Sequence, residues 1–71
     1  MTKYYIHNVP KPRDILAVTG GYIVGAHRLR GTPPTVVNYI SFGDKLELME
    51  DSVWVNIYRE LTEEEHFLYF I

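Results

Sequence analysis

Side chains that could act as nucleophiles, bases or metal ligands are few in this sequence. The serines available for a hydrolytic triad with a histidine and an aspartate are Ser41 and Ser52. Neither stands in a nucleophile-elbow motif, and a chain of 71 residues has little room for a substrate cleft. The three histidines, His7, His27 and His66, lack the spacing of metal ligands, and there is no cysteine. We therefore expect a protein that is not an enzyme and has no cofactor.

The glycines do not form a phosphate-binding loop. Gly20, Gly21 and Gly25 lack the P-loop pattern with its lysine and hydroxyl residue. Gly20 and Gly21 instead separate two apolar runs, residues 15–19 and 22–24. Because paired glycines accept the positive φ angles of a two-residue turn, these runs are predicted to form a β-hairpin.

The length and composition indicate one small domain over residues 1–71. A chain of this size buries only about 60% of its unfolded surface, so compact packing or self-association must stabilise it. The absence of cysteine fits a reducing compartment, and neither a signal-peptide pattern nor a membrane-spanning apolar run is present. We expect a cytoplasmic protein, located in the host cytoplasm if it is viral.

Short β-rich segments separated by glycine and proline follow one another along the chain. Strands are predicted at residues 4–9, 15–19, 22–29 and 36–42. With the segments that follow, this pattern predicts an all-β domain of five to six antiparallel strands. Either a small sheet or an SH3-like, partly open barrel would satisfy it.

The clearest alternation of apolar and polar residues lies on either side of Asp51 and Ser52. A tight turn there would pair residues 45–50 with residues 53–58 as a hairpin. One face would then be aliphatic and buried, with Leu46, Leu48, Val55 and Ile57. The other face would carry Lys45, Glu47, Met49, Trp54, Asn56 and Tyr58.

The C-terminal segment allows two interpretations. Residues 62–65, Thr-Glu-Glu-Glu, match a capping box with acids in the first helical turn. Residues 66–71 are aromatic and apolar throughout, which suits a strand. A strand and a short C-terminal helix both remain open, and in either case we expect the segment to be docked on the domain.

Charge is divided unevenly along the chain. Residues 1–42 carry a formal charge of +4 and residues 43–71 carry −6, which gives −2 at pH 7. The acids that could meet a basic partner are Glu47, Glu50, Asp51, Glu60, Glu63, Glu64 and Glu65. Carboxylates at strand spacing can occupy positions like those of duplex phosphates, and a homodimer would lengthen the strip. The alternative is that these acids form a solvated rim that meets no partner.

Two aromatic side chains complete the predicted partner-binding set. Trp54 and Tyr58 belong to residue types that dominate the energetics of many interfaces. The alternative is that the C-terminal segment or a dimer mate covers them.

Direct binding of nucleic acid through the basic segment 27–30 is a weaker hypothesis, because the isoelectric point of the chain is about 5.8 and nucleic-acid-binding domains are usually basic.

Two resemblances bear on function. Residues 42–55, FGDKLELMEDSVWV, resemble the central part of an SH3 domain, in which a Gly-Asp turn precedes an alternating strand and a Trp begins the next. This implies an SH3-like protein-interaction adaptor as one alternative. In size, lack of cysteine and acidic C-terminal half, the chain is also similar to small phage-encoded host-takeover proteins. That resemblance implies a DNA-mimic inhibitor that acts on HU-like nucleoid proteins, and it is the leading hypothesis.

Overall fold

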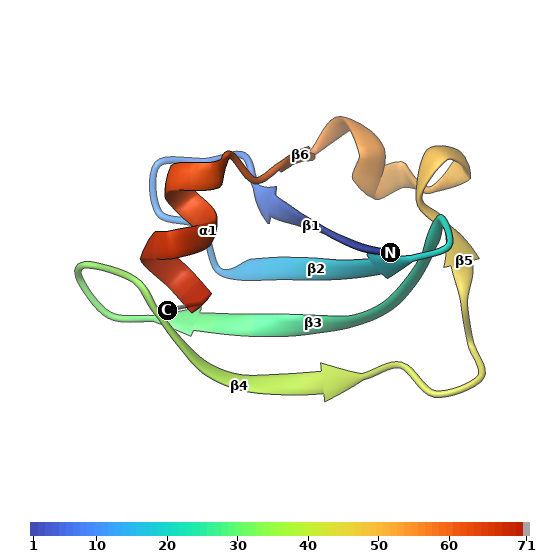
Figure 1. Cartoon of the computed structure of the whole chain (residues 1–71), viewed down its shortest axis with the longest axis horizontal. Coiled ribbons are helices and arrows are strands. Elements are labelled where there is room, and N and C mark those ends of the chain that lie inside the picture. The colour runs from blue at the N-terminus through green and yellow to red at the C-terminus, as the bar shows by residue number, and fades with distance from the viewer. Residues whose placement is uncertain (71) are drawn as a thin grey trace.

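The computed structural model describes residues 1–70 and contains an open antiparallel sheet with one short helix (Figure 1). The strands are β1 (Thr2–His7), β2 (Asp14–Thr19), β3 (Tyr22–Arg30), β4 (Thr35–Ser41), β5 (Glu47–Leu48) and β6 (Tyr58–Glu60). Two 3-10 helices, η1 (Met49–Asp51) and η2 (Val53–Asn56), precede β6, and α1 (Glu63–Phe70) follows it. The prediction of a mostly β, antiparallel domain of five to six strands is confirmed, and the sheet has six.

The strands are ordered β4-β3-β2-β1-β6, and the sheet does not close into a barrel. The predicted hairpin at Gly20 and Gly21 is confirmed: it joins β2 to β3, and the two φ angles are 59° and 86°. β5 pairs with the beginning of β3, so β4 and β5 share one side of that strand.

Each face of the sheet has a hydrophobic core of its own. One core contains Leu16, Val18, Ile23, Ala26, Met49 and Tyr58. The other contains Ile6, Ile15 and Leu29, against which Tyr69 and Phe70 of α1 pack. Successive strand side chains point to opposite faces, so the central strand β2 supplies both cores and is apolar at four consecutive buried positions, residues 15–18.

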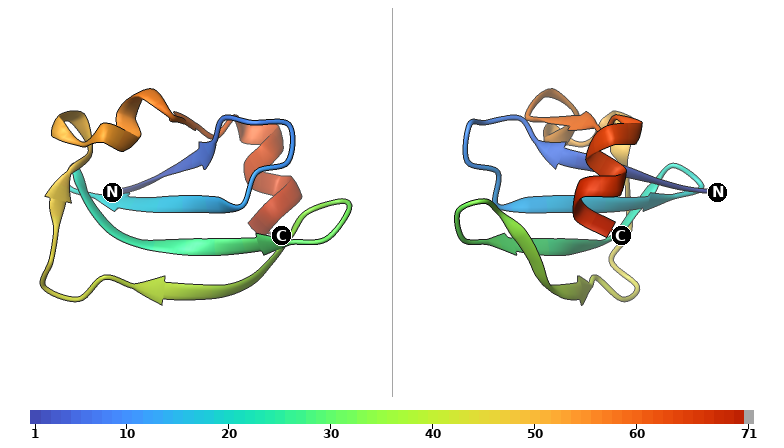
Figure 2. Two further views of the ribbon diagram at one scale, coloured as in Figure 1. Left: turned by 180° about the vertical axis from the view of Figure 1, so that it is seen from behind. Right: turned by 60° about the vertical axis from the view of Figure 1, so that its left-hand side comes forward.

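The C-terminal segment forms a helix rather than a strand. Thr62 and Glu65 make the reciprocal capping box: the Glu65 N–H donates to Thr62 Oγ1 at 3.2 Å, and the Thr62 N–H donates to Glu65 Oε1 at 3.1 Å. The helix crosses one face of the sheet, in front of β2 and β3 in Figure 1 and behind them in the left view of Figure 2. This local cap, together with the docking of Phe70, decides between the two alternatives.

The predicted hairpin of residues 45–58 is wrong. Ser52 caps η2 by accepting the Trp54 N–H at 3.0 Å, which starts a helical turn where the second strand was expected. The Met49 N–H donates to Gly21 O at 2.8 Å, so the segment docks on the β2–β3 turn instead of pairing with itself.

This correction moves two residues of the expected outer face into the core and three residues of the expected core face to the surface. Met49 and Tyr58, expected on the outer face, are only 4% and 8% exposed. Leu46 and Ile57, expected in the core, are 44% and 40% exposed, and Val55 is similarly exposed. Trp54 lies in η2 and does not begin a strand, which departs from the SH3 pattern.

Candidate protein-binding site

The acidic C-terminal segment runs along one edge of the molecule. From β5 the chain passes through η1, η2 and β6 to the start of α1, along the top of the view in Figure 1. Residues 47–65, here called the acidic edge, contain seven acidic side chains and a single basic one, Arg59. The predicted partner-binding residues therefore all lie in one continuous structural segment.

Trp54 is the centre of an exposed apolar patch on this edge. Its ring is 40% exposed and meets the Tyr58 ring edge-to-face, with centroids 5.9 Å apart and planes at 90°. The patch, called the η2 patch, consists of the exposed residues Val53, Trp54, Val55 and Ile57. Residues 53–57 are all exposed, whereas the residues that flank them, Met49, the capping Ser52 and Tyr58, are buried.

Tyr58 supports the patch from inside the core. Its hydroxyl donates to Asp14 Oδ2 at 3.0 Å, and its ring stacks on His7 at 5.2 Å. Burial and the negative charge of Asp14 raise the pKa of Tyr58 well above its usual value of 10.0. Tyr58 thus orients Trp54 and presents little surface of its own to a partner.

The first group of acids borders the η2 patch. Glu50 and Asp51 are exposed on η1, directly before the Ser52 cap. Glu47 is exposed on β5, and its Oε1 accepts the Ser52 hydroxyl at 3.4 Å. Ser52 therefore links Glu47 to the backbone of Trp54, and Glu50 and Asp51 lie in a 3-10 turn instead of the predicted hairpin.

The second group of acids lies at the other end of the edge, around the start of α1. Glu60, Glu63 and Glu64 are exposed there. Glu65 instead makes two hydrogen bonds of 2.6 Å to the Arg59 guanidinium, which together with the Thr62 contacts lowers its pKa to about 2. Glu65 is thus part of the helix cap and is largely neutralised by Arg59.

A cavity of about 460 Å³ opens beside the first group, and the sequence did not predict it. Its walls include Lys3 and Tyr5 of β1, Leu48 and Met49, and Val55 of the η2 patch. These residues come from segments far apart in the chain, so no local pattern could have indicated the cavity. Its size suits an apolar side chain or a small ligand.

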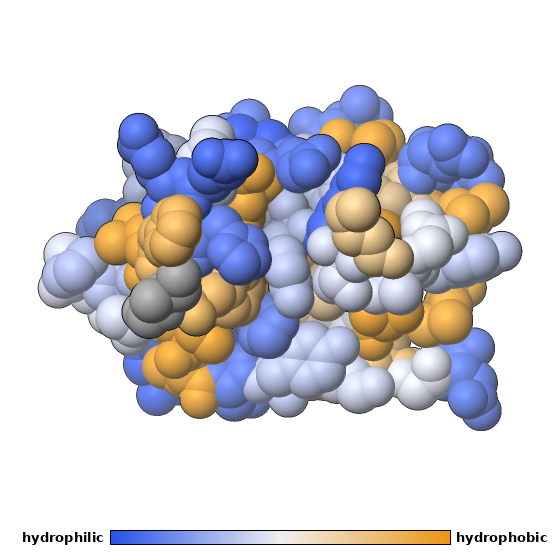
Figure 3. Space-filling view, in the orientation of Figure 1, coloured by the Kyte–Doolittle hydropathy of each residue, from blue (hydrophilic) through white to orange (hydrophobic). Residues whose placement is uncertain are grey.

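Hydrophobic residues also reach the surface away from the acidic edge. Figure 3 shows them over α1, where Phe67 and Leu68 are exposed, and at the opposite end of the molecule.

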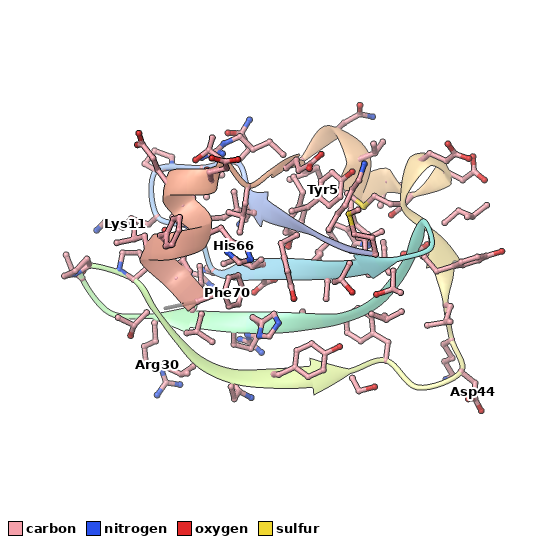
Figure 4. The ribbon with its side chains drawn as sticks, viewed as in Figure 1. Tyr5, Lys11, Arg30, Asp44, His66 and Phe70 are labelled. Atoms are coloured by element: carbon pink, nitrogen blue, oxygen red, sulfur yellow. The ribbon has the colours of Figure 1, made fainter. Side chains whose placement is uncertain are left out.

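Charged residues also lie at both ends of the molecule. Lys11 and Arg30 lie at the same end as α1, whereas Asp44 lies at the other end (Figure 4). Of the basic segment 27–30, Arg28 forms an ion pair with Asp14 at 3.6 Å.

Comparisons with protein-family models, with curated proteins and with solved structures gave no match. Within residues 1–70, no three histidine, cysteine, aspartate or glutamate side chains are grouped so that they could hold a metal ion. No helix in that part of the chain is long and apolar enough to span a membrane. The geometry of the acidic edge and the η2 patch is therefore the basis for a functional proposal.

Proposed function

We propose that this protein is a non-enzymatic binding protein that inhibits a basic partner, of the DNA-binding class, by occluding its functional surface with the acidic edge. The observation that carries the proposal is the half-exposed Trp54, held edge-to-face on buried Tyr58 and bordered by Glu50 and Asp51. Tryptophan is one of the residue types that dominate the binding energy of many interfaces, and polar groups usually surround such an anchor at the rim.

The acids would supply attraction and orientation. Only Glu65 of the seven acidic side chains forms an ion pair within residues 1–70. The other six leave a negative edge whose field accelerates encounter with a basic surface and is screened by salt. The two groups, one at each end of the edge, would contact separate parts of the partner.

Trp54 would supply affinity that salt does not remove. Its ring is already positioned by Tyr58 and by the Ser52 cap, so binding would cost it little conformational entropy. The neighbouring Val53, which is 72% exposed, would exclude water from the contact. Salt should therefore weaken the electrostatic attraction of the acids but not the apolar contact of Trp54, so an experiment can measure the two contributions separately.

The test uses an HU-type nucleoid protein bound to a fluorescently labelled DNA duplex. The wild-type chain should release the duplex, and release should weaken as salt is raised. Trp54→Ala should reduce release at every salt concentration, whereas Phe67→Ala, which also removes an exposed aromatic ring, should act like wild type. No release by the wild type would contradict this partner class.

Charge reversal tests the acidic edge separately. The double variants Glu50→Lys/Asp51→Lys and Glu63→Lys/Glu64→Lys leave the Glu65 cap intact and should each weaken release at low salt. Binding that depends on Trp54 but responds neither to salt nor to these reversals would support the alternative of an apolar peptide adaptor and would overturn the electrostatic part of the proposal.

A further inference from the structure

Strand β4 is an unprotected edge of the sheet. It pairs only with β3, and its sequence, TVVNYIS, contains no charged residue. Val37, Tyr39 and Ile40 are exposed along it, and Phe42 is exposed directly after it. The opposite edge, β6, has only three residues and includes Arg59 and Glu60, so it lacks the length and apolar character of β4.

The backbone direction of β4 identifies the groups that are open to a partner. The Phe42 N–H donates to Val24 O at 3.0 Å, toward β3. Backbone groups of an antiparallel strand alternate in direction, so the N–H and C=O of Tyr39 and Ser41 point away from β3. The ladder is irregular near Val37, which leaves residues 38–42 as the regular part of the edge.

We propose that β4 pairs antiparallel with β4 of a second copy of this chain, about a two-fold axis at Ile40. Tyr39 then lies opposite Ser41 of the other copy, and the two such pairs supply about four backbone hydrogen bonds. Ile40 meets its own counterpart, and Asn38 meets Phe42 of the second copy. Ile40 and Phe42 stand on the same face, so the pairing brings these two exposed apolar side chains of each chain beside those of the other.

The charges at the two ends of β4 favour a second copy as the occupant. Arg30 lies at one end of β4 and Asp44 at the other (Figure 4). An antiparallel pair places the Arg30 end of one chain beside the Asp44 end of the other. Asp44, Lys45 and Glu47 together carry a formal charge of −1, which complements the arginine, and β4 itself adds no like charge.

Sedimentation equilibrium on the whole chain tests this pairing. The wild type should approach twice the monomer mass as its concentration is raised from micromolar to millimolar. Ser41→Pro removes the outward N–H without removing a β3 hydrogen bond and should abolish the dimer. Ser41→Ala, the matched control, loses the same 3.4 Å contact from the Gly43 N–H but keeps its own N–H and should remain dimeric.

A second variant and a second measurement keep the test decisive if the proline disturbs folding. Ile40→Lys should also give a monomer with an unchanged circular dichroism spectrum. In hydrogen exchange, the Tyr39 and Ser41 amides should be protected only at dimer-forming concentration, while those of Ile40 and Phe42 should be protected at both. A wild type that stays monomeric, or a dimer that persists in folded Ser41→Pro and Ile40→Lys, would overturn the inference. Trp54→Ala should leave the dimer intact, so this result is independent of the proposed function.

Discussion

The Tyr58 hydroxyl donates a hydrogen bond of 3.0 Å to Asp14 Oδ2 and so joins two residues that are 44 positions apart in the sequence. Tyr58 is the first residue of β6 and Asp14 the first residue of β2, and the strand between them in the sheet is β1. The same tyrosine ring supports Trp54. The bond therefore couples the core of the sheet to the η2 patch.

Removing this bond should destabilise the fold. We expect Tyr58→Phe to lower the free energy of unfolding by about 1–2 kcal/mol, because a partly buried hydrogen bond to a carboxylate is lost. Urea unfolding followed by circular dichroism measures the change. Tyr22→Phe is the control, since Tyr22 is exposed and its hydroxyl makes no hydrogen bond within residues 1–70. Equal stability of the two variants would contradict the role of the bond.

The alkaline stability should depend on the same residue. The pKa of Tyr58 is raised in the folded state, so its neutral form contributes stability that is complete below pH 10 and is lost as the pH rises above it. Wild type should therefore lose stability more steeply than Tyr58→Phe as the pH is raised above 10, the ordinary tyrosine pKa, as measured by urea unfolding at each pH. Parallel curves would argue against the raised pKa.

The burial of Met49 and the exposure of Leu46 predict costs of different size at these two apolar positions. Met49→Ala should lower the free energy of unfolding by about 2–5 kcal/mol, because Met49 is buried in the core formed with Leu16 and Ile23. Leu46→Ala should cost much less, because Leu46 is 44% exposed. Thermal unfolding of both variants measures the difference. A larger cost at Leu46 would instead support the hairpin that the alternating sequence predicts.

The helix cap should lose its effect in acid. Glu65→Gln should cost about 1 kcal/mol at pH 7, because the ion pair with Arg59 and part of the cap are weakened. The pKa of Glu65 is lowered from 4.5 to about 2, so this stabilisation is complete above pH 4.5 and is lost as the pH falls toward 2. Urea unfolding at several pH values should show the two stabilities converging in acid. Glu64→Gln, at an exposed neighbouring position, should show no such difference.

His27 should titrate below its usual range. Burial beside the rings of Tyr39 and Phe70, at centroid distances of 4.6 and 4.9 Å, lowers its pKa from 6.5. The neutral form is favoured in the fold, so the associated stability is lost as the pH falls from 6.5 through the lowered pKa. Phe70→Ala should raise the pKa measured by NMR titration, whereas Phe67→Ala, at a position 63% exposed, should not change it.

Local sequence was sufficient for the elements whose contacts are themselves local. The turn at Gly20 and Gly21 follows from two adjacent residues that tolerate positive φ angles. The capping box of Thr62 and Glu65 joins residues three positions apart, so its pattern is visible in the sequence. The acidic edge was also predictable, since residues 47–65 stay together as one segment of the chain.

Local sequence failed where distant residues decide the outcome. The alternation in residues 45–58 is typical of a hairpin, but the Ser52 cap and the bond from Met49 to Gly21 O override it. Which side chains are buried then depends on the sheet face that the segment covers, and that face is assembled from β1, β2 and β3. The cavity beside Val55 and the open edge of β4 also depend on distant residues. Long-range pairing sets the order of the strands, and no single segment of the sequence indicates that order.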